Sequence, residues 1–113
     1  MTGDTLHGDN VKAKFGAGDD LQIYHDGSNS YVSDVGTGNL SLQSNGGEVT
    51  MWDSANAQTM AQFKTGAEVS LRHNNSIKLA TTSTGIDVTG TITSDDTTLA
   101  AYNNTSAITG NAV

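Results

Sequence analysis

Two aspartates beside closely spaced glycines could bind a metal. Asp19 and Asp20 end the segment Gly16-Ala17-Gly18-Asp19-Asp20. Carboxylates and turn carbonyls supply the oxygen ligands that calcium prefers, and glycine-aspartate loops of this kind occur in repeated calcium-binding solenoids. The second copy of the phrase, Gly36-Thr37-Gly38-Asn39, has lost the carboxylate. We therefore predict a turn that leads into a strand, with calcium as the less favoured alternative.

Two histidines occupy equivalent segments. His25 lies in Tyr24-His25-Asp26-Gly27-Ser28, and His73 lies 48 residues later in Arg72-His73-Asn74-Asn75-Ser76. Around a threefold axis each imidazole would recur three times, and three imidazoles can hold a transition metal. An exposed histidine in a turn is more often unliganded. We predict no cofactor, and keep calcium or a transition metal on a trimer axis as the alternative.

The hypothesis that the protein is an enzyme depends on Asp26 and Asp34, which could form the carboxylate pair of a glycosidase. Both aspartates are explained better as turn formers, and no Ser/His/Asp order, nucleophile elbow or phosphate loop accompanies them. The sequence predicts that the protein is not an enzyme and has no catalytic residue.

Three aromatic residues could contact carbohydrate. Trp52, Tyr24 and Tyr31 would stack on sugar rings if their side chains are exposed, although packing in a core or between subunits is the commoner role of so few rings. They are the candidate glycan-binding residues.

The composition limits which partners the protein can bind and how large a hydrophobic core one chain can form. Five Lys and Arg against twelve Asp and Glu give a formal charge of −7, which disfavours nucleic acid and anionic membrane surfaces as partners. No apolar run approaches the ~20 residues of a membrane helix. Leu, Ile, Val and Phe make up only 21 of 113 residues. A chain with so few large apolar residues in regular order is expected to bury them against copies of itself.

The scarce apolar residues alternate with polar ones between turn signals, which is typical of short strands. The expected strand centres lie near positions 22, 32, 41, 50, 61, 70, 78 and 87, about nine residues apart. Three hairpins are predicted: Leu21/Ile23 with Tyr31/Val32, Leu40/Leu42 with Val49/Met51, and Val69/Leu71 with Ile77/Leu79. The segment 54–64 would suit a short helix or an irregular strand, and strand is preferred.

Alternation also predicts which side chains face solvent. The apolar residues should share one face of each strand, and the residues between them should face water. Those residues are Gln22, Ser41, Thr50, Ser70, Lys78 and Asp87.

Several stretches resemble known proteins. The most specific are DLQIYHDGSNSYV at 20–32 and TGIDVTGTI at 84–92, and the matching segments run from about Asn10 to Thr93. They are similar to tail-fibre and other virion fibre proteins of marine bacteriophages, particularly cyanophage-like ones. The resemblance implies an elongated homotrimeric β fibre segment in a virion, often one piece of a longer protein.

We thus expect an all-β fold of short strands in an elongated, intertwined homotrimer: a triple-stranded β-helix, a β-prism or a solenoid-like fibre. The expected organisation is a lead-in segment at 1–14, a repetitive β-hairpin fibre domain at 15–93 and a C-terminal tail or connector at 94–113. The expected function is a structural virion component, a tail-fibre or spike segment that presents a host-contacting end. The alternatives are a carbohydrate-binding module that contacts host surface polysaccharide, and a subunit of a self-assembling extracellular filament.

The expected partners are the chain itself, other virion tail proteins and a host surface glycan, with no nucleic acid and no membrane. The expected location is the virion, and the extracellular space after release.

Overall fold

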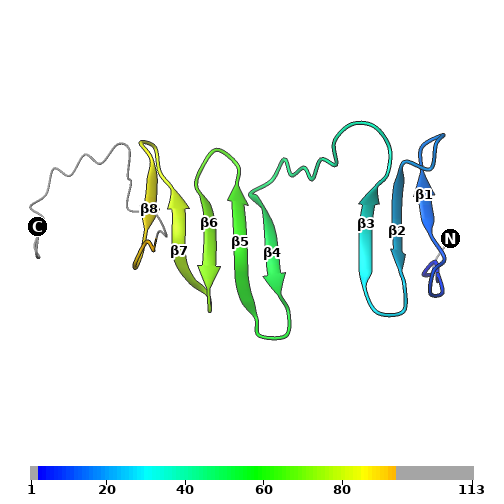
Figure 1. Ribbon diagram of the computed structural model, residues 1–113, viewed down its shortest axis with the longest axis horizontal. Helices are drawn as coiled ribbons and strands as arrows, with labels where there is room; N and C mark the ends of the chain where they lie inside the picture. The colour runs from blue at the N-terminus through cyan, green and yellow to red at the C-terminus, as the bar shows by residue number, and fades with distance from the viewer. Residues whose placement is uncertain (1–2, 94–113) are drawn as a thin grey trace, which may run out of the picture. The chain divides into compact units, whose positions relative to one another are not determined.

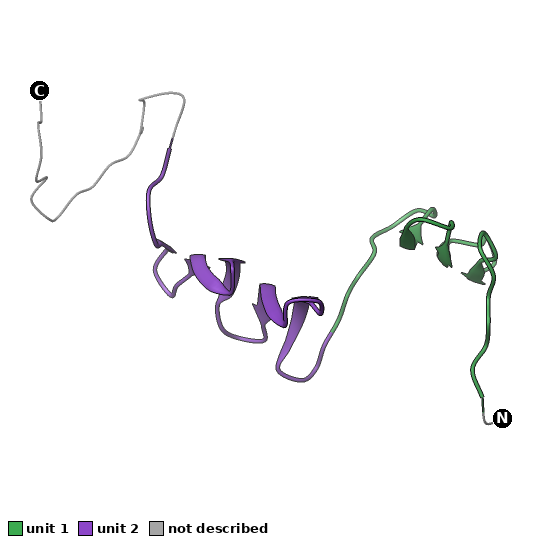
Figure 2. Cartoon of the chain, turned by 90° about the horizontal axis from the view of Figure 1, so that it is seen from below, with its two compact units in different colours: residues 1–43 green, residues 44–113 purple. Residues whose placement is uncertain are grey.

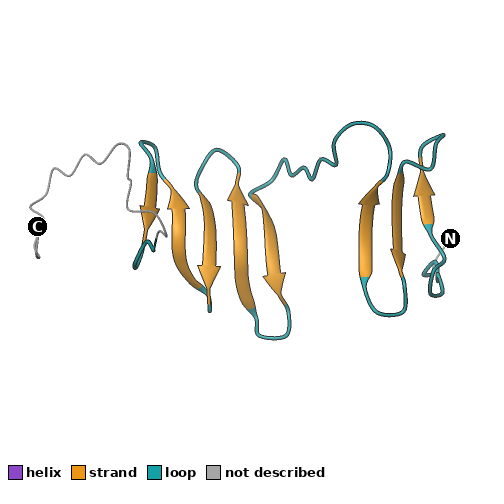
Figure 3. Ribbon diagram, in the orientation of Figure 1, coloured by secondary structure: helices purple, strands orange, loops and turns teal. Residues whose placement is uncertain are grey.

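The computed structural model describes residues 3–93, and this part of the chain is all-β with no helix (Figure 3). Eight strands form two antiparallel sheets (Figure 1). The chain divides into two compact units, residues 1–43 and 44–113. The predicted all-β class is confirmed, and the predicted domain at 15–93 spans both units.

Unit 1 holds a three-stranded meander in the order β1-β2-β3. The strands are β1 (Ala13–Phe15), β2 (Leu21–His25) and β3 (Ser30–Asp34). The predicted hairpin of Leu21/Ile23 with Tyr31/Val32 is confirmed, because Ile23 pairs with Val32 and Tyr24 with Tyr31.

Unit 2 holds a five-stranded meander in the order β4-β5-β6-β7-β8. Its strands are β4 (Glu48–Asp53), β5 (Gln58–Lys64), β6 (Val69–His73), β7 (Ser76–Thr81) and β8 (Ile86–Val88). The predicted hairpin of Val69/Leu71 with Ile77/Leu79 is confirmed. The preference for strand in segment 54–64 is also confirmed, since β5 follows a four-residue turn there.

The prediction of a strand near position 41 is wrong. Residues 35–47 contain no strand, so Leu40 and Leu42 do not form a hairpin with Val49 and Met51, and β4 pairs with β5 instead. Two apolar residues in alternation are too few to define a strand without a neighbour to complete its hydrogen bonds. A strand that the rhythm did not include, β1, pairs with β2 in its place.

Each sheet is a single layer within its unit. In Figure 2 the strands of each unit are seen nearly end-on and form one row, with no second layer against it. Among the described residues only Ala61 and Ser70 are buried, at 6% and 0% exposed. Both side chains are small and lie between longer ones. In a single layer, only longer neighbouring side chains can cover a side chain.

Ser70 contradicts the prediction that it faces solvent. Gln62 pairs with it across the sheet and Arg72 follows it on the same face of β6, and the Arg72 Nη2 donates to the Gln62 Oε1 at 2.5 Å. These two long side chains meet over the serine. Gln22 is half-buried in the same way, because Lys12 donates to its Oε1 at 2.8 Å, whereas Thr50, Lys78 and Asp87 are exposed as predicted. Ser41 is exposed but lies outside any strand.

The described residues include no helix that is long and apolar enough to cross a membrane. The predicted tail at 94–113 lies outside the described residues.

The β4–β5 turn provides a test of the backbone geometry. Ala57 has φ = 53°, in the left-handed region that costs an L-residue about 1–2 kcal/mol. Ala57→Gly should therefore raise the free energy of unfolding by about 0.5–1 kcal/mol, after the added entropy of the unfolded chain is subtracted. Urea unfolding at fixed protein concentration measures the change.

Ala55, in the same turn, is the matched control because its φ is not positive. Ala55→Gly should lower stability by about 0.4–1 kcal/mol. Equal shifts in both variants would contradict the assigned turn.

Candidate functional site

The most extensive candidate site is one face of the five-stranded sheet. Residues paired across neighbouring strands point to the same side, and consecutive residues point to opposite sides. The pairing places one apolar residue from every strand in a single row: Met51, Ala61, Leu71, Leu79 and Val88. We call this row the apolar spine.

A second row lies beside the spine on the same side. Val49 pairs with Phe63, and Phe63 pairs with Val69. At the far end of the sheet, Ile86 pairs with Thr81. We call the spine and these neighbours together the apolar face, which comprises Val49, Met51, Ala61, Phe63, Val69, Leu71, Leu79, Ile86 and Val88.

The apolar face is open to water. Met51 is 56% exposed, Leu71 47% and Ile86 66%. A sheet normally covers its apolar face with another layer, because exposed hydrocarbon costs roughly 25 cal/mol per Å². Within the described residues of unit 2, nothing performs this role.

The opposite side of the sheet, which we call the polar face, is joined by side-chain hydrogen bonds. The Gln62 amide donates to both carboxylate oxygens of Glu48, at 3.0 and 3.1 Å, and the Thr50 hydroxyl donates to one of them at 2.6 Å. The hydrogen bond from Thr50, followed by that from Gln62, lowers the pKa of Glu48. With Arg72 bound to Gln62, the network links three strands and fixes their register.

The three-stranded sheet shows the same division. Ala13, Ile23 and Val32 form an apolar row that crosses all three strands. Lys14, Gln22 and Ser33 form the corresponding row on the other side. Ile23 is 44% exposed and Val32 is 55% exposed.

Two of the three predicted glycan-binding rings contact each other. Tyr24 and Tyr31 are stacked with their ring centroids 4.8 Å apart, and the Lys12 Nζ lies 4.5 Å from the centroid of Tyr24. Nothing fits between rings at that separation, so Lys12 covers the other side of Tyr24. Only Tyr31 therefore keeps one open ring face. Trp52 belongs to unit 2, on β4, and is 53% exposed.

Asp26 organises the turn between β2 and β3. Its carboxylate accepts hydrogen bonds from the backbone N–H groups of Asn29 at 2.7 Å and Ser28 at 2.8 Å, and from the Tyr31 hydroxyl at 2.8 Å. These bonds, that from Asn29 most strongly, lower the pKa of Asp26, and the bond to Asp26 raises the pKa of Tyr31.

Asp26 and Asp34 do not form a carboxylate pair. They flank the two ends of β3, whose five residues span about 17 Å at ~3.4 Å each. Glycosidase carboxylates lie no more than ~9.5 Å apart. Asp34 instead accepts a hydrogen bond from the Gly36 N–H at 3.1 Å, so both aspartates form turns as expected.

The candidate metal ligands lie apart. Asp19 forms an ion pair with Lys14 at 2.8 Å, and the His25 Nδ1 lies 3.0 Å from the Ser30 hydroxyl. His73 ends β6, in the other unit. In residues 3–93 no three His, Cys, Asp or Glu side chains are grouped as metal ligands. A metal shared between copies on a symmetry axis stays a prediction.

Asp20 lies against three glycines. A Cβ at Gly16, Gly18 or Gly36 would come within 2.6, 2.8 or 2.8 Å of the Asp20 side chain. Gly16 also has φ = 91°. The glycines thus let the aspartate fold over the turn that leads into β2, which is the structural role predicted for this loop.

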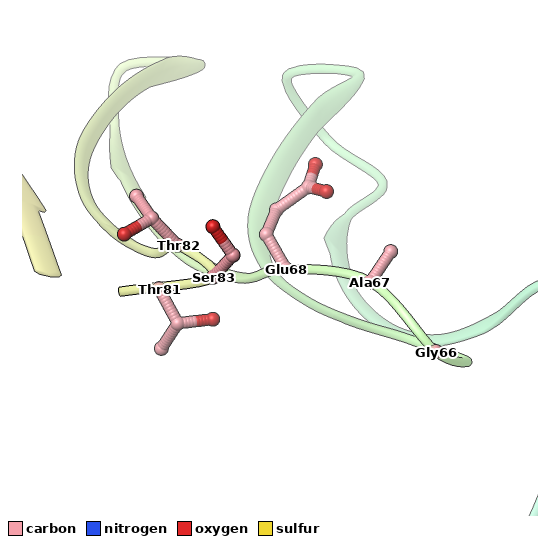
Figure 4. Close-up of a pocket in the computed structure, with 6 residues that line it drawn as sticks. All are labelled: Gly66, Ala67, Glu68, Thr81, Thr82 and Ser83. Atoms are coloured by element: carbon pink, nitrogen blue, oxygen red, sulfur yellow. The ribbon is translucent and has the colours of Figure 1, made fainter. Parts of the chain in front are cut away.

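A shallow hollow of about 330 Å³ lies at one end of the five-stranded sheet, lined by Gly66, Ala67, Glu68, Thr81, Thr82 and Ser83 (Figure 4). Three of its four polar side chains are already engaged. Glu68 pairs with Lys64, the Thr81 hydroxyl accepts from the Val69 N–H, and the Thr82 hydroxyl accepts from the Gly85 N–H.

The network of Glu48, Gln62 and Arg72 was not anticipated from the sequence. These residues are 14 and 10 positions apart. Only the register of β4, β5 and β6 aligns them, and no local motif indicates that register.

Comparison with protein-family models, with curated proteins and with solved structures gave no match to this chain.

The turn at Asp26 should respond to pH in a defined direction. Because the pKa of Asp26 is lowered from its usual 3.8, the carboxylate stabilises the hairpin above about pH 4, and this contribution is lost as the pH falls through the folded-state pKa. An NMR titration of the Asp26 carboxyl carbon should give a midpoint below 3.8.

The same titration should move the amide signals of Ser28 and Asn29, which donate to this carboxylate. In the Asp26→Asn variant, the amide signals of Ser28 and Asn29 should no longer shift with pH in this range. A midpoint at or above 3.8 would show that the hydrogen bonds do not persist in solution.

Proposed function

We propose that this chain is a non-enzymatic structural subunit, a homotrimeric β-rich segment of a phage tail fibre or spike that extends and presents a host-contacting end. The observation that supports this proposal most is the exposed apolar face of the five-stranded sheet. A sheet that is apolar on one side and has no second layer needs other polypeptide to cover it.

The number and position of the apolar residues favour self-association over a monomer. Seventeen large apolar side chains are exposed among the described residues, whereas the buried hydrophobic residues number one. Soluble monomers seldom expose contiguous apolar patches above a few hundred Å², and larger patches mark interaction surfaces. In a trimer of identical chains each apolar face would meet two others, which removes it from water without more hydrophobic residues per chain.

The sequence resemblance supplies the biological setting of the proposal. The segments at 20–32 and 84–92, which resemble marine phage fibre proteins, include β2, the start of β3 and β8. We accordingly propose a virion location, with extracellular exposure after release, and with the chain itself and other tail proteins as partners.

The oligomeric mass tests this function. Sedimentation equilibrium should give three times the chain mass of 11.7 kDa, together with a β-type circular dichroism spectrum. The mass should stay constant on dilution through the micromolar range, because an intertwined trimer buries its apolar faces in every copy. A folded monomer would refute the proposal, and an open-ended mass series would favour the filament alternative.

A second candidate function, contact with host glycan, is favoured by the placement of Trp52. Its ring is on β4, is 53% exposed and points to the polar face, beside the hydroxyl of Thr50 on the same strand. Exposed rings with nearby polar groups are suited to stacking on sugars. Covering the apolar face would leave this ring accessible.

The single Trp makes this candidate directly measurable. If Trp52 binds sugar, its fluorescence should change saturably on titration with host surface oligosaccharide, and calorimetric titration should show that Trp52→Ala no longer binds. Tyr31→Phe keeps the ring and should retain the response. A flat titration at millimolar oligosaccharide would remove glycan binding at this position.

A further inference from the structure

We infer that the apolar face of β4–β8 lines the threefold axis, so that three copies of the sheet close a triangular prism with the polar faces outside. The inference rests on the proposed trimer and specifies which surface forms it. The occupant of the apolar face is therefore a second and third copy of the same chain.

The distribution of charge over the sheet favours identical copies as the occupant. The chain carries a formal charge of −7, so copies that met through charged surfaces would repel each other. None of the nine residues of the apolar face is ionisable. By the pairing, Glu48, Lys64, Arg72 and Asp87 all lie on the polar face. Alternation also places Asp53 and His73 on this side, at the strand ends beyond Met51 and Leu71. The Asp53 carboxylate accepts a hydrogen bond from the Asn56 amide within its own turn. Copies can thus meet through the nine apolar residues, with the ionisable groups of this side confined to the strand ends.

The size of the apolar face fits an interface. Five strands at about 4.8 Å spacing are about 19 Å across from the first to the last, and five residues along a strand span about 17 Å. The resulting area of a few hundred Å² is in the range of patches that mark interaction surfaces, and a standard interface buries about 800 Å² per partner. Because side chains project from the plane of the sheet, the accessible area of the apolar face is larger than this flat area and closer to about 800 Å².

The strand length explains why three copies fit. If the strands lie across the axis, the sides of an equilateral prism are one strand wide, about 17 Å for a five-residue strand. The centre of such a triangle is about 5 Å from each side, which is half the ~10 Å that separates packed sheets. Side chains of ordinary size therefore fill the prism, with neither a central channel nor a clash.

The apolar spine would then run along the axis. Its residues follow one another from strand to strand, so each strand contributes one layer of three identical side chains. Three copies of Ala61 make the smallest layer, between layers of Met51 and Leu71. The long, flexible Met51 can fill the space that alanine leaves.

Two neighbouring residues on β4 form a matched pair for the test. Met51 and Trp52 are both large, are 56% and 53% exposed, and point to opposite faces. Met51→Asp should place three carboxylates near the axis, where they are desolvated and repel each other, and the sedimentation mass should fall about threefold. Trp52→Asp should leave the trimer mass unchanged.

The outcomes separate this inference from the proposed function. If the unaltered chain is a monomer, the trimer itself is refuted. If the unaltered chain is a trimer but Trp52→Asp dissociates it, or Met51→Asp leaves it intact, the trimer stands and the assigned face is overturned.

A second measurement does not depend on the folding of an aspartate variant. The chain has no cysteine, so a single introduced thiol is unique. Leu71→Cys should place three thiols around the axis, and a short bismaleimide should convert the protein to a two-chain band under denaturing conditions. Thr50→Cys, on the polar face of β4, should give no such band. Cross-linking of Thr50→Cys, or its absence in Leu71→Cys, would overturn the inference.

Discussion

The hydrophobic effect can stabilise these two sheets only to the extent that their apolar faces are covered. An antiparallel sheet exposes two faces, and burial requires a second layer against at least one of them. The five-stranded sheet places an apolar residue from every strand in one row, and the three-stranded sheet does the same, yet the described part of each unit is a single layer. Isolated sheets of this size gain little from burial, so the proposed association would contribute to folding itself.

Within each single layer, polar contacts fix the register of neighbouring strands. A sheet with a weak core is prone to slip by one residue, which would exchange its two faces. Local polar contacts oppose such a slip. Asp26 ties the β2–β3 turn through three hydrogen bonds, Asn74 and Asn75 adopt the positive φ of a two-residue hairpin, and Gln62 links Glu48 to Arg72 across three strands. These contacts keep the apolar residues aligned in one row on one face of the sheet, where they could form an interface.

Alternation separates the two proposed functions on a single strand. On β4, Met51 points to the apolar face and Trp52 to the polar face, so self-association and contact with a host glycan do not compete for the same side chains. Two carboxylates of the five-stranded sheet are engaged: Glu48 accepts hydrogen bonds from Thr50 and Gln62, and Glu68 pairs with Lys64. The buried Ser70 hydroxyl and the Arg72 Nε have no hydrogen-bond partner among the described residues.

The sequence by itself determined the fold class, most of the strands and two hairpins, because period-two alternation and turn residues act over a few neighbouring positions. It also indicated that Asp26 and Asp34 form turns. It failed at Leu40 and Leu42, where alternation exists but no neighbouring strand completes the hydrogen bonds, and the predicted nine-residue rhythm did not include β1. Only the tertiary structure decided the register, and the register decided which side chains are buried and which lie in one row. It buried Ser70 beneath Gln62 and Arg72, and it aligned Met51, Ala61, Leu71, Leu79 and Val88 in one row. Such rows join residues up to 37 positions apart, and no local pattern specifies which residue lies opposite which.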